Sequence, residues 1–205
     1  MKSTRFCTDN REYPKISAFL LLPKAFIFTI QRKYFNIYKE LPWIPFSAIK
    51  KIKSIIRPSW KVLEIGAGMS TIWLAKNVDS VVSIEADKNW INRLQEKLNN
   101  LKLKNVKLIF ENRGDLMADF SNFPDEYFDF ILIDGGPRDI CCKNALSKIK
   151  KGGYIYLDNS DSLHLCGNGA DILKNFANIR SKKIYKFIDF VPGNFFVTEG
   201  LLIEA

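Results

Sequence analysis

The chain has 205 residues, enough for one substantial α/β domain with a small appendage, and its 47% apolar and 26% charged residues are ordinary for a globular protein. This composition excludes collagen-like, disordered and disulfide-built chains, and four cysteines without zinc-site spacing predict free thiols in a reducing cytoplasm. The net charge of +9 is uneven, because residues 1–61 hold 13 Lys/Arg and 3 Asp/Glu whereas residues 62–205 hold 18 and 19.

The basic N-terminal part has two open interpretations. It contacts something anionic, such as a membrane surface, nucleic acid or an acidic substrate, or it is a solvated basic face. Within it, the apolar run Ile16–Ile30 has 15 residues and is interrupted by Pro23 and Lys24. A bilayer span needs about 20 apolar residues, so this run is too short. We expect an interfacial anchor, a core-packing helix or a cap over the active site.

The proline-punctuated stretch Leu41–Phe46 predicts the end of this region, and a short helix follows over residues 47–57. We therefore predict a basic helical extension over residues 1–58 and a main domain over residues 59–205.

The main domain alternates between two kinds of segment. Continuous apolar runs predict buried strands, and longer amphipathic runs predict helices between them. Strands are predicted at 61–66, 80–85, 105–110, 128–133, 153–158, 184–190 and 195–203. Helices are predicted at 70–77, 88–101, 115–120, 139–150 and 168–179. The fold class is therefore α/β, a three-layer α/β/α sandwich around a seven-stranded, mostly parallel sheet that ends in an antiparallel hairpin.

A glycine turn follows the first of these strands in the stretch "VLEIGAGMST" (Val62–Thr71). Glycines let the backbone approach a ligand closely, and the next helix presents free N–H groups at its start. Both a dinucleotide and S-adenosylmethionine suit such a turn. However, Thr71 stands where a dinucleotide turn has its third glycine, Glu64 precedes the turn, and Glu85 ends the second strand.

With these residues, the sequence resembles the class I S-adenosylmethionine-dependent methyltransferases, most clearly over residues 60–160. The resemblance implies a Rossmann-like fold in which the first glycine turn holds the methionine part, the Glu85 carboxylate holds the ribose and Asp115 meets the adenine. The implied cofactor-binding residues are Glu64, Gly66, Ala67, Gly68, Ser70, Thr71, Glu85, Ala86, Asp115 and Asp134. Other interpretations are that Glu64 or Asp115 caps a helix and that Glu85 is a surface carboxylate.

Two later strands end in acidic loops, "LIDGGPRD" (Leu132–Asp139) and "LDNSD" (Leu157–Asp161). This spacing resembles the metal-dependent O-methyltransferases of the catechol type. It implies that Asp134, Asp158 and Asn159 bind one divalent ion, such as Mg²⁺, and act with Arg138 in catalysis. The general-base lysine of those enzymes has no counterpart here, since Gly135–Arg138 occupy the loop. The alternatives are ordinary turn chemistry for the second loop and an anion-binding or loop-shaping role for Arg138 and Asp161.

The sequence therefore predicts a cytoplasmic S-adenosylmethionine-dependent methyltransferase that acts on a small or medium-sized acceptor, at oxygen. Three alternatives remain open. They are an RNA or other nucleic-acid methyltransferase that uses the basic N-terminal segment, a non-catalytic S-adenosylmethionine-binding module, and a nicotinamide-dependent dehydrogenase.

Overall fold

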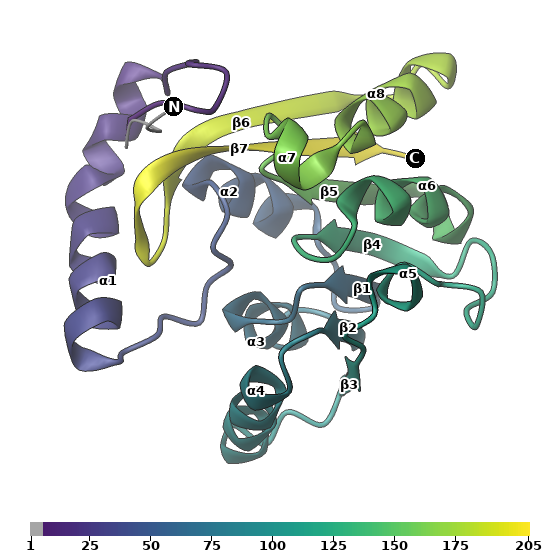
Figure 1. The fold of residues 1–205 in the computed structure, drawn as a ribbon, viewed down its shortest axis with the longest axis horizontal. Helices are drawn as coiled ribbons and strands as arrows, with labels where there is room; N and C mark the ends of the chain where they lie inside the picture. Colours follow the sequence, from purple (N-terminus) through teal and green to yellow (C-terminus); the bar gives the residue numbers. More distant parts are fainter. Residues whose placement is uncertain (1–5) are drawn as a thin grey trace.

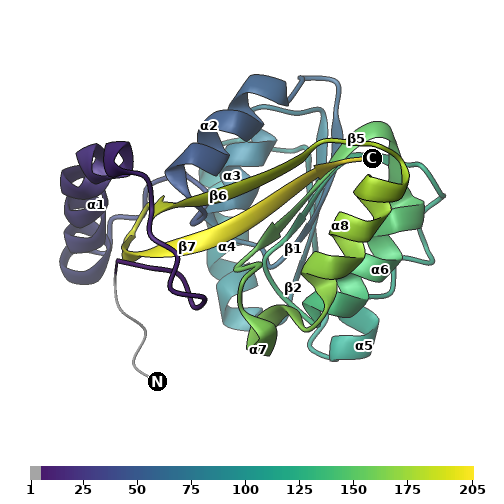
Figure 2. The ribbon, with the colours of Figure 1, turned by 90° about the horizontal axis from the view of Figure 1, so that it is seen from above.

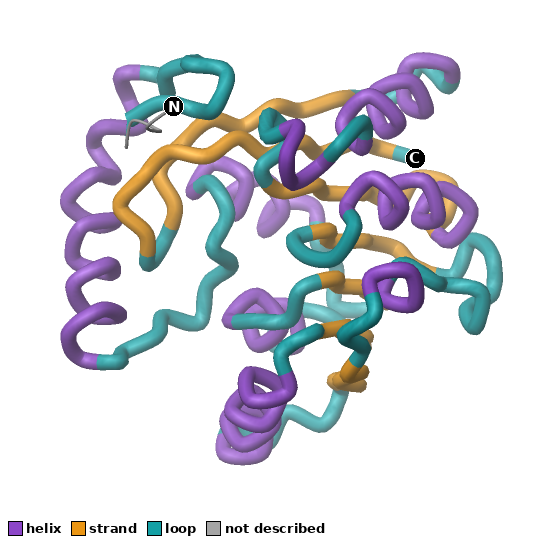
Figure 3. The backbone as a smooth tube through the Cα atoms, viewed as in Figure 1, coloured by secondary structure: helices purple, strands orange, loops and turns teal. Residues whose placement is uncertain are grey.

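The computed structural model describes residues 6–205, which fold around one seven-stranded sheet (Figures 1 and 3). The strands are β1 (Lys61–Ile65), β2 (Ser80–Glu85), β3 (Val106–Phe110), β4 (Phe128–Ile133), β5 (Ile149–Asp158), β6 (Ile184–Val191) and β7 (Asn194–Glu204). Their order is β3-β2-β1-β4-β5-β7-β6, and β7 alone runs opposite to the other six strands. The predicted fold class and its terminal hairpin are confirmed.

Helices cover both faces of the sheet (Figure 2). One face carries α2 (Phe46–Ile55), α3 (Met69–Ala75) and α4 (Lys88–Asn100). The other carries α5 (Gly114–Met117), α6 (Arg138–Lys148), α7 (Leu163–Cys166) and α8 (Gly169–Ile179).

The two faces are filled by alternate residues of the same strands. In β4, Phe130 and Leu132 pack toward α2 and α3, whereas Ile131 and Ile133 pack toward α6 and α8. All four side chains are buried, which explains why the strand reads as a continuous apolar run.

Three elements differ from the sequence-based prediction. β5 begins at Ile149, earlier than predicted, and the four-residue helix α7 was not predicted. The apolar run forms a 3₁₀ helix, η1 (Ile16–Leu21), followed by α1 (Leu22–Phe35), which extends five residues past the end of the run at Ile30. Pro23 lies in the first turn of α1, where its missing N–H costs no hydrogen bond.

The N-terminal helices pack against the β6–β7 hairpin where it extends past the carboxyl end of β5 (Figures 1 and 2). Ala25 of α1 packs with Phe46, Phe190 and Val197 in a separate apolar cluster. No helix within the described residues is both long and apolar enough to cross a lipid bilayer.

All four cysteines are buried, and none forms a disulfide within the described residues. Cys141 and Cys142 lie on α6 in the main core, where burial raises the pKa of Cys141 to about 12. These two thiols therefore act as small apolar side chains and not as a reactive pair.

Candidate functional site

The predicted site residues cluster around the carboxyl edge of the parallel strands, where β1 and β4 lie side by side. The chain turns away in opposite directions after these two strands, toward β2 and toward β5, which opens a crevice between them. Gly66 begins one turn and Asp134 begins the other, and the N–H of Asp134 donates to the carbonyl of Ile65 at 2.8 Å.

Gly66 is required by this close approach. Its φ of +92° lies in the left-handed region, and a Cβ atom there would come within 3.0 Å of the Asp134 and Gly135 backbone. The two turns are therefore in direct backbone contact, and only a residue without a side chain fits between them.

A buried hydrogen-bond chain holds the glycine turn in shape. The Gly68 N–H donates to Thr71 Oγ1 at 2.9 Å, and that hydroxyl donates to Glu64 Oε2 at 2.5 Å. Ser83 of β2 donates to the same carboxyl oxygen at 2.5 Å. On the solvent side, Trp90 Nε1 donates to the Ala67 carbonyl at 2.8 Å. Trp90 was not predicted to belong to the site, since it lies on α4 more than twenty residues after the turn.

Glu64 lies beneath the turn and has no solvent-exposed surface. Burial raises its pKa from 4.5 to about 7, although the hydroxyl groups of Ser70, Ser83 and Thr71 lower it. The structure thus gives Glu64 contacts with the turn and with β2, while the cavity described next is lined by other residues.

A cavity of 450 Å³ opens at this edge. Its wall joins the loops that follow β1, β2, β3 and β4. It is lined by Gly66, Glu85, Ala86, Asn112, Gly114, Met117, Asp134, Gly135, Gly136 and Pro137.

Glu85 is held in place at the mouth of this cavity. Its Oε1 accepts hydrogen bonds from the N–H groups of Ala86 at 2.8 Å and Asp87 at 2.9 Å. No hydrogen bond within the described residues reaches Oε2, so that oxygen remains available to a ligand hydroxyl.

The predicted cofactor-binding residues separate into two groups. Gly66, Glu85, Ala86 and Asp134 line the cavity, whereas Ala67, Gly68, Ser70 and Thr71 shape the adjoining turn and the start of α3. Asp115 is exposed on α5 and does not line the cavity, where Asn112 and Gly114 from the same loop appear instead. Asn112 lies in the loop after β3, two residues past the end of the strand, and this position at a strand end is the signal that identifies it.

The predicted catalytic residues meet at one point, the guanidinium group of Arg138. Its Nη1 donates to the Asp158 carbonyl at 2.5 Å and to Asn159 Oδ1 at 3.0 Å. Its Nη2 donates to the Asp134 carbonyl at 2.8 Å and to Asp134 Oδ1 at 3.0 Å. Arg138 is buried, so a positive charge links the ends of β4 and β5 inside the protein.

The two aspartates of this cluster differ in exposure. Asp158 is buried, and Tyr156 Oη donates to its Oδ1 at 3.2 Å. Burial, and secondarily the charge of Asp134, raise the pKa of Asp158 well above its usual value. Asp134 is partly exposed and lines the cavity. Burial raises its pKa to about 6, although the charge of Arg138 lowers it. Asp158, the more buried of the two, therefore holds its proton more strongly than an ordinary aspartate, and Asp134 is the carboxyl group that faces the cavity.

The predicted divalent-ion site does not fit this geometry. Arg138 donates to the side-chain oxygens of Asp134 and Asn159 and to the Asp158 carbonyl, so a positive charge already lies among the three predicted ligands. The Asp158 carboxyl group is instead paired with Tyr156. Within residues 6–205, no group of three or more His, Cys, Asp or Glu side chains is arranged to hold a metal ion.

The N-terminal segment and the hairpin form a wall beside this cluster. The N–H of Asp9 donates to Asp161 Oδ2 at 2.6 Å, and Ser160 Oγ donates to Glu199 Oε1 at 2.9 Å. At the hairpin tip, Arg32 of α1 donates to Asn194 at 2.7 Å. The loop after β5 is thereby tied to two segments that come from opposite ends of the chain.

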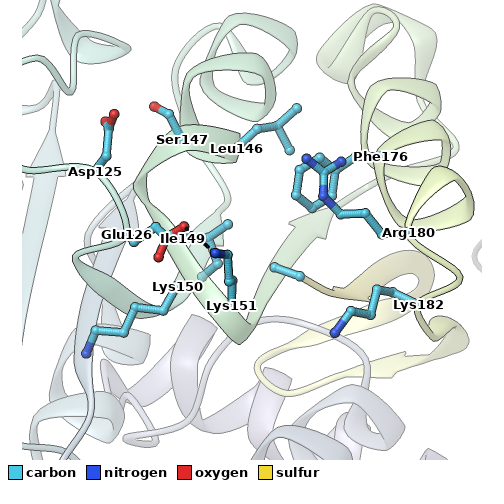
Figure 4. Close-up of a pocket in the computed structure, with 11 residues that line it drawn as sticks. Asp125, Glu126, Leu146, Ser147, Ile149, Lys150, Lys151, Phe176, Arg180 and Lys182 are labelled. Carbon is cyan, nitrogen blue, oxygen red and sulfur yellow. Dashed lines mark ion pairs between the residues drawn. The ribbon is translucent and has the colours of Figure 1, made fainter.

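A second cavity, of 520 Å³, lies at the other end of the sheet between α6, α8 and the start of β5 (Figure 4). Lys151 faces Glu126 at 3.7 Å, and the Arg180 guanidinium lies over the Phe176 ring at 3.8 Å. None of the predicted site residues lines this cavity, so the carboxyl edge remains the candidate site.

Comparison with known proteins agrees with this location. Residues 63–160 match a family model described as a methyltransferase domain. A putative O-methyltransferase from Klebsiella pneumoniae has a similar structure, with a TM-score of 0.64 and 17% identity, over 94% of this chain and 96% of that one.

The O-methyltransferase TomG from Streptomyces achromogenes, solved in complex with SAM, is similar with a TM-score of 0.62 and 18% identity, over 90% of this chain and 88% of that one. A precorrin-6y C5,15-methyltransferase from Geobacter metallireducens has a TM-score of 0.59 and 15% identity, over 77% of this chain and 87% of that one. A search of curated proteins found no match. The matched residues 63–160 include the glycine turn, Glu85 and the Arg138 cluster.

Proposed function

We propose that this chain, a class I S-adenosylmethionine-dependent methyltransferase, transfers the methyl group to an oxygen atom of a small or medium-sized acceptor. The observation that carries the proposal is the Asp134 carboxyl group, which lines the cavity beside a buried cation and has a pKa of about 6. An acceptor hydroxyl must lose a proton during transfer, and a base with this pKa is ionised at neutral pH.

The residues around the cavity suit the methyl donor. Oε2 of Glu85 would accept hydrogen bonds from the ribose hydroxyls, and the Gly66 turn would let the backbone approach the methionine part. Asn112 and Gly114 would border the adenine. When bound, S-adenosylmethionine supplies a methyl group that is already activated on a positively charged sulfur.

The chain's own contribution is then positioning and proton removal. Asp134 would accept the hydroxyl proton, and Arg138 would hold the carboxylate toward the acceptor while its charge favours the ionised form. Burial raises the pKa of Asp158, which would stay a structural partner of this pair.

The acceptor class is tested by measuring S-adenosylhomocysteine release with purified protein and separate pools of phenols, catechols, carboxylic acids and RNA. Release with a hydroxyl-bearing small molecule supports the proposal. Release with RNA alone would favour a nucleic-acid substrate, and donor binding without release from any pool would favour a non-catalytic module.

The same assay tests the role of Arg138. Because its guanidinium takes the cation position, we expect that a chelator such as EDTA leaves the release rate unchanged. A rate that EDTA abolishes and Mg²⁺ restores would contradict this role.

A further inference from the structure

The outer face of η1 and α1 presents large apolar side chains to solvent. Ile16 is 89% exposed, Leu20 83%, Tyr34 78% and Ile27 52%. Leu20, Ile27 and Tyr34 are spaced by seven residues, which puts them on one side of the helical segment. Figure 2 shows α1 at the outer end of the molecule, beyond the hairpin on which its inner side packs. Such a stripe on a surface helix indicates an interaction site.

The same segment carries only positive charge. Residues 13–39 contain five Lys/Arg and no Asp/Glu. Lys15, Lys24 and Lys33 are exposed, and none of them forms an ion pair with a carboxylate within residues 6–205. The Lys24 ammonium lies over the Phe28 and Phe46 rings at 5.7 and 5.4 Å, which leaves its charge uncompensated.

We infer that this face, formed by Ile16, Leu20, Ile27 and Tyr34 and flanked by Lys24, docks on an anionic lipid surface. The apolar side chains would enter the boundary between headgroups and acyl chains, and the lysines would pair with lipid phosphates. Exposed aromatic residues such as Tyr34 suit the same depth. At 14 residues, α1 is about 21 Å long and would lie along the surface.

Charge and chemistry favour this occupant over two others. A second copy of the chain would bring the same uncompensated lysines against each other, which opposes association. A nucleic acid would satisfy the lysines but would leave Ile16 and Leu20 without an apolar partner. Anionic lipid satisfies both features at once.

The inference is independent of methyl transfer, because it concerns a face that does not line the cavity. Its test is co-sedimentation of the full chain with vesicles of phosphatidylcholine alone and of phosphatidylcholine mixed with phosphatidylglycerol. We expect binding to the mixed vesicles that weakens with added salt, and little binding to phosphatidylcholine alone.

Two kinds of variant test which features are used. Leu20→Ser should weaken vesicle binding about tenfold, since it removes an inserted apolar side chain. Ile179→Ser is the matched control, because Ile179 is 82% exposed on α8, and it should bind as the parent does. Lys24→Gln should weaken binding about fivefold, and Lys107→Gln on β3 should not.

All of these positions are exposed, so circular dichroism should show the same fold for each variant. Absence of binding to the mixed vesicles at low salt overturns the inference. Binding that Leu20→Ser leaves unchanged also overturns it, because contact would then be electrostatic alone. A concentration-dependent dimer in analytical ultracentrifugation that Leu20→Ser dissociates would overturn it in favour of a second copy.

Discussion

Glu64 illustrates how a single side chain at this site acts through its neighbours. Its carboxyl group is fully buried and holds the glycine turn through Thr71 while it also bonds Ser83 of β2. A carboxyl group in this environment keeps its proton to higher pH than in the unfolded chain, which links the shape of the turn to pH.

This linkage gives a stability prediction. Below pH 4.5, Glu64 is protonated in both states, and its contribution to the free energy of unfolding is fully present. As the pH rises to about 7, the unfolded carboxyl ionises while the folded one does not, so the folded state loses about 3 kcal/mol.

Glu64→Gln removes this ionisation with little change of shape. Urea unfolding of the variant should therefore vary less between pH 4.5 and 7 than that of the parent. If the free energy of unfolding changes with pH by the same amount in both proteins, Glu64 does not titrate as the structure indicates.

In the proposed function, Asp134 accepts the proton of the acceptor hydroxyl. We expect Asp134→Asn to lower the turnover number about a hundredfold or more while the donor still binds, since the amide cannot accept the proton. In the parent protein, turnover should rise with pH and level off above about 6, where Asp134 becomes ionised. Turnover that survives in the variant with an unchanged pH profile would remove Asp134 from this role.

Among the elements, the turn between β1 and α3 is the most constrained. Gly66→Ala should lower the free energy of unfolding by about 1–3 kcal/mol, because a side chain there meets both a left-handed φ and the Asp134 backbone. Gly68→Ala is the matched comparison, since its nearest neighbour would be Ser70 Oγ at 3.6 Å and its φ is extended. Chemical denaturation measures the free energy of unfolding of both variants. Equal losses in Gly66→Ala and Gly68→Ala would mean that the backbone contact between the two turns does not contribute to stability.

Some of the helices and strands could be predicted from sequence patterns, and others could not. Apolar runs and their alternation with helices predicted all seven strands, because each strand is buried on both faces. Helix α7 was missed since four residues are too few for a helical period. Pro23 reads as an interruption of the apolar run in the sequence, although it lies in the first turn of α1 and is compatible with the helix.

The positions of the site residues could be predicted from the sequence where these residues lie at the ends of strands. Asp134 and Asp158 follow adjacent parallel strands, so their proximity could be inferred from sequence. The sequence could not show that the Arg138 guanidinium lies between them, because four oxygens at the ends of β4 and β5 set the rotamer of that side chain.

At the scale of the whole molecule, the N-terminal segment connects two surfaces. Its inner side packs on the hairpin and contacts the loop after β5 through Asp9, and its outer side carries the apolar and basic face. The segment therefore contacts the loop after β5 on its inner side and presents the proposed lipid-binding face on its outer side.

The central claim is that the cavity between the glycine turn and Glu85 binds S-adenosylmethionine. Isothermal titration of the parent, of Glu85→Ala and of the control Glu96→Ala, which changes an exposed carboxylate on α4, tests it most directly. We predict that the parent and the control bind equally and that Glu85→Ala loses about 1–3 kcal/mol of binding free energy, a roughly 5- to 150-fold weaker Kd. Absence of heat with S-adenosylmethionine, together with clear binding of NAD, would contradict the account.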